Sequence, residues 1–288
     1  MTLTWKTKVV LITSAYLIVL TSVVYYLIMV GWVKFYVISF LVIPYGYSYT
    51  TMISITLLIL YSLLTLATLP DVVKYKSVDA QVGSFINRIA AYLKSGVTLY
   101  EAIRLAKDGL VGYFKDVVDR LDTMISLGVS FDDAVNMVLK EVNHEYGYVL
   151  RILSVAMRSG GRSVDVVEKA SNILSYFHTY RDYRKRMFKQ YLVLLIMIVI
   201  VYDFTVAFLV LMLNSLTKSE LPFIIKPDVE LIYTLLYYTS IAISSVSGIS
   251  YGKATEGSIL RAFPYVLAIT TLNSTLIHIL PAVVVNLL

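Results

Sequence analysis

A histidine–glutamate pair and a glycine–lysine run are the first places to look for chemistry in this 288-residue chain. His144-Glu145 begins like a helical zinc motif, but Tyr148 stands where the second histidine should follow. The run from Gly248 to Ala254 resembles a phosphate-binding loop. Its spacing is one residue short, and alanine replaces the hydroxyl that would hold magnesium. Both motifs therefore fail on the residue types that their chemistry requires.

Metal and thiol chemistry finds no better support elsewhere in the chain. There is no cysteine, which excludes disulfides, thiolate zinc sites and iron–sulfur clusters. His178 and His278 are far apart in the sequence, and we interpret them as surface or helix-end residues. We predict a protein that is not an enzyme, with no catalytic residue, no metal, no cofactor and no nucleic-acid partner.

One acid, Asp203, lies near the middle of a long apolar run. Burying a carboxyl group at that depth in lipid costs free energy, so it should face protein or water instead of lipid. A hydrogen bond to another helix is the favoured interpretation. The alternative is an ion pathway, which would make the chain a small transporter or channel.

Small residues form a stripe on a later apolar segment, where Ser240, Ser244, Gly248 and Gly252 recur every four residues. Such a stripe lets a second helix approach closely in a membrane. Packing within the chain and contact with another subunit are both open at this point.

The charged middle of the chain is electrically lopsided. Acids dominate from Asp108 to Glu145, and this surface is either a solvated face or a partner surface. Bases dominate from Arg151 to Lys189, which membrane topology and anionic lipid would explain. The candidate partner-facing acids are Asp116, Asp119, Asp122, Asp132 and Asp133, and the membrane-proximal bases are Arg181, Arg184, Lys185, Arg186 and Lys189.

A glycine followed by a hydroxyl residue recurs three times between Lys94 and Val167. A glycine can supply the left-handed residue that closes a helix, and the hydroxyl can cap the free N–H groups of the next helix. The pattern predicts antiparallel helices joined by tight turns. The glycines are Gly96, Gly128 and the pair Gly160-Gly161, and the capping residues are Thr98, Ser130 and Ser163.

Hydropathy divides the chain into three parts. A composition that is 58% hydrophobic, with a mean hydropathy of +0.75, favours an integral membrane protein. We expect an all-α fold with about five transmembrane helices. The spans are predicted at 9–30, 49–69, 191–213, 231–250 and 262–287, with a loop or re-entrant piece at 31–47 and an external loop at 214–230.

The charged block should form a six-helix cytoplasmic bundle between the second and third spans. Its helices are predicted near 78–94, 98–109, 112–127, 130–142, 145–159 and from 163 onward. Pro70-Asp71 is expected to stop the second span, so the domains are 1–70, 71–190 and 191–288. The excess of lysine and arginine in the block predicts a multi-pass protein of the cytoplasmic membrane with this block inside.

Three stretches resemble a known family. Residues 85–103 (Phe85-Ile-Asn-Arg through Glu101-Ala-Ile103) and 156–167 (Ala156-Met-Arg-Ser-Gly-Gly-Arg162) look like glycine motifs of the F domain of type II secretion and type IV pilus platform proteins. Ser250-Tyr-Gly-Lys-Ala-Thr-Glu-Gly-Ser258 resembles a cytoplasmic turn of archaeal platform proteins, including those of the archaellum (TadC-like). Together the stretches cover roughly residues 80–262.

The resemblance implies a membrane platform on which pilin-like subunits are assembled by a separate hexameric ATPase. It also implies a six-helix cytoplasmic domain. Many family members carry two such domains and this chain has one, so the resemblance suggests pairing with itself or with a sister subunit. Gly161 stands where many relatives have an acid.

Overall fold

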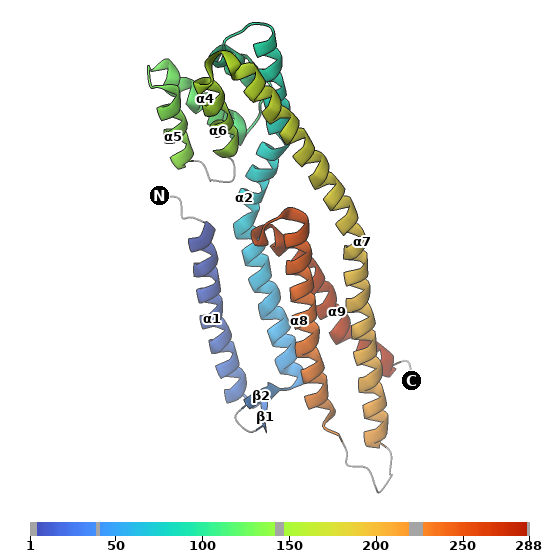
Figure 1. Cartoon of the computed structure of the whole chain (residues 1–288). Coiled ribbons are helices and arrows are strands. Elements are labelled where there is room, and N and C mark those ends of the chain that lie inside the picture. Colours follow the sequence, from blue (N-terminus) through green and yellow to red (C-terminus); the bar gives the residue numbers. More distant parts are fainter. Residues whose placement is uncertain (1–4, 39–40, 142–146, 219–226, 287–288) are drawn as a thin grey trace. The chain divides into compact units, whose positions relative to one another are not determined.

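The computed structural model describes residues 5–38, 41–141, 147–218 and 227–286, and 88% of it is helical. The chain forms two compact units, which we name the spanning unit (Met1–Leu69 with Arg184–Leu288) and the bundle unit (Pro70–Tyr183). Figure 1 shows the elements in chain order. They are α1 (Trp5–Met29), β1 (Lys34–Ile38), β2 (Leu41–Tyr45), α2 (Tyr47–Lys94), α3 (Leu99–Lys107), α4 (Tyr113–Ser126), α5 (Phe131–Glu141), α6 (Gly147–Arg158), η1 (Gly160–Arg162), α7 (Ser163–Lys218), α8 (Val229–Glu256), η2 (Ile259–Ala262) and α9 (Phe263–Asn286).

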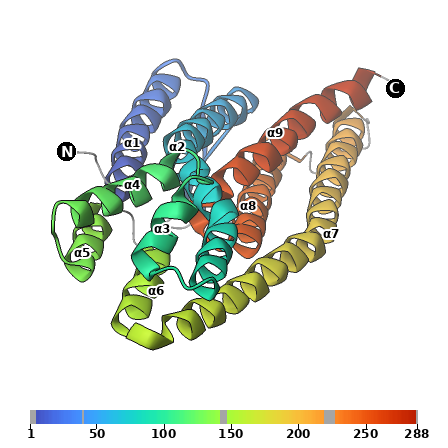
Figure 2. The same cartoon turned by 90° about the horizontal axis from the view of Figure 1, so that it is seen from above.

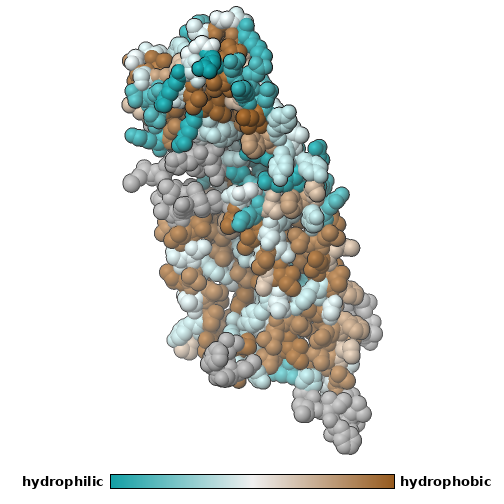
Figure 3. All heavy atoms as spheres, in the orientation of Figure 1, coloured by the Kyte–Doolittle hydropathy of each residue, from teal (hydrophilic) through white to brown (hydrophobic). Residues whose placement is uncertain are grey.

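Five helices in the described part of the chain are long and apolar enough to cross a membrane: α1, α2, α7, α8 and α9. The expected number of spans is thereby confirmed. Apolar side chains cover much of the visible surface of the spanning unit, whereas hydrophilic ones gather on the bundle unit (Figure 3). Since lipid is as apolar as these side chains, the outward-facing residues of a spanning helix need no protein cover.

Residues 31–47 were expected to form a loop or a re-entrant piece, and the structure instead has two paired strands there. β1 and β2 pair as an antiparallel hairpin in which Lys34 lies opposite Tyr45. The run is rich in aromatic and β-branched residues, which favour strands. The hairpin is fastened to the start of α8, because the Glu230 carboxylate accepts hydrogen bonds from Lys34 Nζ at 2.5 Å and from the Tyr47 amide at 3.1 Å.

Pro70 does not stop the second span. It lies inside α2, which runs on to Lys94 as a single helix of 48 residues. A proline removes one helical hydrogen bond, and membrane proteins tolerate this where the surroundings support the helix. The predicted third span likewise belongs to a longer helix, because α7 runs 56 residues from Ser163 to Lys218. The external loop expected at 214–230 lies partly outside the described residues.

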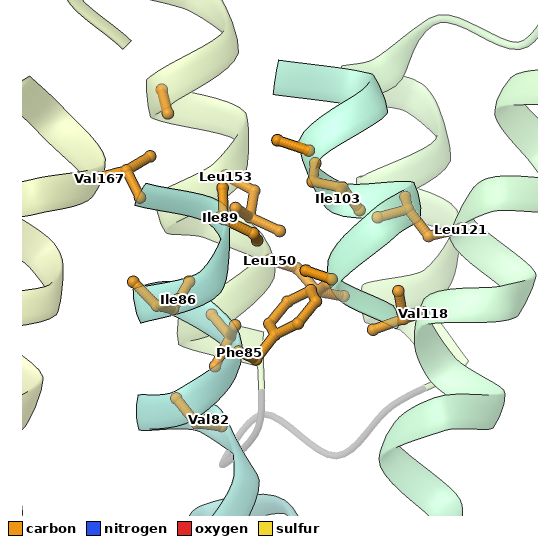
Figure 4. Close-up of a cluster of buried hydrophobic side chains, with 14 of the residues drawn as sticks. Val82, Phe85, Ile86, Ile89, Ile103, Val118, Leu121, Leu150, Leu153 and Val167 are labelled. Carbon is orange, nitrogen blue, oxygen red and sulfur yellow. The ribbon is translucent and has the colours of Figure 1, made fainter. Parts of the chain in front are cut away.

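The bundle unit is built around one hydrophobic core, to which α2 to α7 all contribute. Figure 2 shows these helices from above. α3 shows how the sequence makes it: Leu99, Ala102, Ile103 and Ala106 recur at helical spacing and are buried. In Figure 4 labelled side chains of α2, α3, α4 and α6 gather around Phe85. The Phe85 ring meets Phe114 edge-on at 5.3 Å between ring centroids.

Two of the three predicted turns have the capping geometry that their residue types favour. Thr98 Oγ1 accepts a hydrogen bond from the Glu101 amide at 3.4 Å, and Ser130 Oγ accepts one from the Asp133 amide at 3.2 Å. Ser163 instead has helical dihedrals (φ −57°, ψ −36°) after the short helix η1. It is therefore the first residue of α7 and not its cap.

Candidate functional site

The basic residues at the membrane-proximal part of α7 make a joint with the end of α8, both within the spanning unit. Arg184 Nη2 donates a hydrogen bond to the Thr255 carbonyl at 3.1 Å, and Lys185 Nζ lies 3.9 Å from Glu256 Oε2. The last carbonyls of a helix have no intrahelical partner and carry the negative end of its dipole. Cations from α7 are therefore the appropriate partners for this end of α8.

Glu256 is the centre of the joint, and sequence reasoning gave it no role. Its side chain is only 9% exposed, and Tyr265 donates a hydrogen bond to Oε1 at 3.2 Å. Arg261 also donates to the Glu256 carbonyl at 3.0 Å. The sequence signal was the polar turn between two apolar runs. It indicates a bend but does not indicate which residues Glu256 contacts.

The other basic residues predicted near the membrane are placed differently. Arg181 belongs to the bundle unit, where it pairs with Asp79 of α2. Arg186 and Lys189 are exposed and make no ion pair with the residues that the structure describes. Only Arg184 and Lys185 among the five reach α8 in the described part of the chain.

A second node joins α7 to both α8 and α9 at the level of Asp203, whose exposure is 0%. Ser240 Oγ donates to Asp203 Oδ1 at 2.9 Å. With its amide nitrogen turned toward the carboxylate, Asn273 donates to the two Asp203 oxygens at 3.3 and 3.2 Å. The predicted interhelical hydrogen bond is confirmed, and it involves two partner helices.

A third polar group links α2, α8 and α9. His278 Nε2 lies 2.9 Å from Ser54 Oγ, and His278 Nδ1 lies 2.9 Å from Tyr233 Oη. Tyr237 Oη completes the group, 2.7 Å from Ser54 Oγ. His278 is thus a half-buried connector between helices, and its interpretation as a surface or helix-end residue is wrong. His144 lies outside the described residues, and the described ones contain no cluster of three or more potential metal ligands.

The small-residue stripe of α8 faces η2 and α9 of the same chain. A Cβ atom added at Gly248 would lie 2.5 Å from the Val266 Cα, and one added at Gly252 would lie 2.3 Å from the Ala262 Cα. Ser244 is fully buried in the same region, while Ser240 serves the Asp203 node. Of the two interpretations left open by the sequence, the structure places these residues in packing within the chain.

The predicted acidic surface of the bundle unit is largely engaged by bases. Lys107 pairs with both Asp119 and Asp122, and Tyr100 donates to Asp122 Oδ1 at 2.8 Å. Burial alone would raise the pKa of Asp122, but the hydrogen bonds from Lys107 and Tyr100 hold it below its ordinary value. Three of the five predicted acids, Asp119, Asp122 and Asp132, pair with bases, which lowers the free negative charge.

The other three predicted acids differ in their contacts. Asp132 binds Ser154 and Arg158, with Arg158 Nε at 2.8 Å, and these hydrogen bonds hold the Asp132 pKa below its usual range. Asp133 accepts a hydrogen bond from Ser130 Oγ at 2.6 Å. Asp116 is exposed and makes no ion pair with any residue in the described ranges.

Two of the glycine turns meet at one surface pocket of the bundle unit. Gly96 has φ +89° and Gly160 has φ +54°, so both are left-handed. Gly128 is also left-handed at φ +89°, while Gly161 is not. The pocket, of about 280 Å³, is lined mainly by apolar residues that flank the two turns: Leu93, Val97, Leu99, Ala156, Met157 and Val164.

A family match covers the middle of the chain. Residues 85–211 match the family described as "Type II secretion system (T2SS), protein F". No curated protein and no solved structure matches the chain. The matched segment begins in α2, includes α3 to α6 and ends near the end of α7. It leaves out the turn at 250–258, which resembled archaeal platform proteins.

Proposed function

We propose that this chain is a membrane platform subunit of an assembly machine, because residues 85–211 match the family of protein F of type II secretion systems. The machine is a type IV pilus-like, archaellum or type II secretion system. The subunit couples a cytoplasmic hexameric ATPase to the assembly of pilin-like subunits, and the bundle unit is the cytoplasmic part. The family match, combined with five helices able to span a membrane, is the observation that carries this proposal.

α7 is the element that would transmit movement in such a machine. It is one helix from Ser163 to Lys218, without an internal glycine or proline. Its first part packs against α2 in an antiparallel arrangement, in which Lys94 pairs with Glu168 and Asp79 pairs with Arg181. Its later part is fixed to α8 and α9 by the joint at Glu256 and the node at Asp203. A stiff helix held at both ends can carry a displacement along the chain.

The direct test of the platform role is removal and replacement of the chain in its own cell. Cells without the chain should lack surface filaments or secreted pilin-like subunits, and the parent chain should restore them. Tagged chain should also co-purify with a hexameric ATPase from membranes. Normal filaments in cells without the chain would refute the platform role.

A single substitution tests whether α7 acts as a stiff connection. Asp182 is exposed, so Asp182→Pro removes no side-chain packing, yet a proline inside a helix costs about 3 kcal/mol and kinks it. The proline variant should insert into the membrane and bind the ATPase but assemble no filaments. Asp182→Ala is the matched control and should behave like the parent. Filaments at the parental level with the proline in place would eliminate α7 as the coupling element.

The acidic side of the bundle unit is proposed to face the ATPase, with Asp116 and Asp133 as the acids to reverse first. Reversing Asp122 or Asp132 would also break ion pairs that hold the unit together. Asp116→Lys with Asp133→Lys should weaken ATPase co-purification, most strongly at low salt, where surface charges act furthest. Asp165→Lys changes an exposed acid outside this region and is the control. Equal ATPase recovery with both variants would show that Asp116 and Asp133 are not at the contact with the ATPase.

A further inference from the structure

The hairpin of β1 and β2 exposes apolar side chains on both of its faces. Phe35, Val37 and Val42 share one face, because Val42 is the cross-strand partner of Val37, and they are 46%, 63% and 55% exposed. Tyr36, on the opposite face, is 44% exposed. A ribbon of only two strands is at best marginally stable in water. This hairpin therefore needs contacts that the described part of the chain does not supply.

Charge is almost absent from the hairpin. Lys34 is the one charged residue between Gly31 and Tyr47, and its ammonium group pairs with the Glu230 carboxylate. Strand edges that meet water are normally protected by charged side chains, because a bare edge would pair with other chains. In the described part of the chain no third strand joins β1 or β2, so each keeps an open edge. Open edges without free charge are unsuited to a hairpin that projects into water.

Three helices of the spanning unit hold the hairpin at the level of their ends (Figure 1). It begins five residues after α1 ends and stops two residues before α2 begins. Tyr238 of α8 donates a hydrogen bond to the Pro44 carbonyl at 2.9 Å, and Val33 is buried against Leu27 and Tyr49. The ends of spanning helices lie where hydrocarbon gives way to headgroups, so the hairpin starts at that level.

The backbone and the side chains of the hairpin together select one layer of the bilayer. Hydrocarbon is unsuitable, because lipid tails cannot bond the N–H and C=O groups of the open edges. Water is unsuitable, because it would surround the apolar side chains of both faces. The headgroup layer offers polar partners to the backbone and also accepts aromatic rings such as those of Trp32 and Tyr36. It is the one layer that satisfies both.

The length of the strands sets the orientation of the hairpin in that layer. Val37 stands three residues beyond Lys34, which is about 10 Å along a strand. The headgroup layer on one side of a bilayer is only about 5–7 Å deep. An upright hairpin would carry Val37 and its partner Val42 through this layer into water. A hairpin that lies along the layer keeps both within it.

We propose that the hairpin is an interfacial anchor, which lies along the membrane in the headgroup layer and contacts phospholipid through Phe35, Val37 and Val42. The leaflet is the one at which α8 begins, the external one in the proposed topology. The anchor fixes the depth of three span ends at once, because the end of α1 and the starts of α2 and α8 are all joined to it. The inference goes beyond the platform role and does not depend on it.

Depth-dependent quenching of fluorescence in vesicles tests the anchor with the full chain. Trp5→Phe and Trp32→Phe remove both tryptophans, and Val37→Trp then places one in β1. The purified chain is reconstituted at low density into phosphatidylcholine vesicles whose acyl chains carry bromine either near the headgroup or near the chain end. We expect about twofold stronger quenching by the shallow bromine, because about 15 Å separates the headgroup layer from the bilayer centre.

Two control positions calibrate the measurement in the same tryptophan-free background. Val19→Trp, on the exposed middle of α1, should be quenched more strongly by the deep bromine. Tyr176→Trp, on the exposed surface of the bundle unit, should be quenched by neither. Quenching of Val37→Trp like that of Tyr176→Trp would place the hairpin in water, and stronger quenching by the deep bromine would place it in hydrocarbon. Either result overturns the inference.

A charge opposite Val37 tests whether apolar side chains hold the hairpin in the layer. Val42→Asp should reduce the quenching of Val37→Trp to the level of Tyr176→Trp, because the carboxylate draws this end of the hairpin toward water. Val42→Thr keeps a β-branched residue that favours strands and should leave the quenching unchanged. Equal quenching in these two variants would refute anchoring through the apolar side chains.

Photocrosslinking in native membranes identifies what covers the hairpin. The parent chain contains no cysteine, so a photoreactive maleimide can be attached at Val37→Cys alone. We expect phospholipid adducts as the main product in mass spectrometry. A main adduct with a second copy of the chain or with another protein would overturn the inference. None of these readouts involves filaments or the ATPase, so failure of the anchor and failure of the platform role are distinguishable.

Discussion

Replacement of Gly96 by alanine isolates the energetic contribution of one backbone conformation. Gly96 has φ +89°, and a Cβ atom added there would meet no atom within 4 Å. The substitution therefore creates no clash, and its effect comes from the backbone alone. An L-residue held in the left-handed conformation destabilises the folded state by about 1–2 kcal/mol. Alanine also restricts the unfolded chain more than glycine does, which stabilises the folded state by about 0.4–1 kcal/mol. We expect the bundle unit to lose about 1 kcal/mol.

Gly161 offers a matched control in the same unit. It also has open space around an added Cβ, but its φ is not left-handed. Gly161→Ala should therefore gain about 0.4–1 kcal/mol through the unfolded chain, with nothing to oppose it. Gly96→Asn should lie between the parent and Gly96→Ala, because asparagine tolerates the left-handed region better than alanine does.

Hydrogen exchange of the full chain in detergent measures both effects. The amides of Val118 and Leu121 lie in the core of the bundle unit and report its opening. A loss of about 1 kcal/mol corresponds to exchange about fivefold faster in Gly96→Ala, and Gly161→Ala should exchange more slowly than the parent. Parental exchange in Gly96→Ala, or equal acceleration in both alanine variants, would refute the conformational argument.

Three further outcomes follow from the contacts. Gly248→Ala should lower the melting temperature in detergent, because overpacking against the Val266 backbone costs about 1–3 kcal/mol and exceeds the helix-propensity gain of at most about 1 kcal/mol; a higher melting temperature would contradict the close helix contact. Asp203→Leu should lower the melting temperature more than Asp203→Asn, because leucine leaves Ser240 and Asn273 without their acceptor; the reverse order would contradict a stabilising role for these hydrogen bonds. The lowered pKa of Asp122 means that its ion pair stabilises the bundle unit at neutral pH and stops doing so as pH falls below about 4, so Asp122→Asn should flatten the acid limb of the stability profile; an unchanged acid limb would exclude Asp122 as its source.

Sequence reasoning succeeded where the deciding interactions are local. Helix ends in the bundle unit follow from a glycine and a hydroxyl residue two positions later, and both act on backbone groups within a few residues. The five spans follow from length and apolar composition, which the bilayer itself selects. These features need no knowledge of what the helices pack against.

It failed where distant residues decide the outcome. Pro70 reads locally as a helix stop, yet α2 continues through it. The partners of Asp203 lie 37 and 70 residues away, so the sequence could indicate a hydrogen bond but not Ser240 or Asn273. Glu256 reads as a loop residue, and only the approach of Lys185 and Tyr265 gives it a role.

The Asp79–Arg181 pair has a consequence for how this architecture can change. It ties α2, nine residues after the bundle unit begins, to α7, two residues before the unit ends, so the two ends of that unit belong to neighbouring helices. A segment with neighbouring ends can be inserted, excised or exchanged with little disturbance to the host chain. The bundle unit is thus a transferable cassette. A gene duplication confined to it would add a second copy in tandem while the membrane helices on either side kept their sequence.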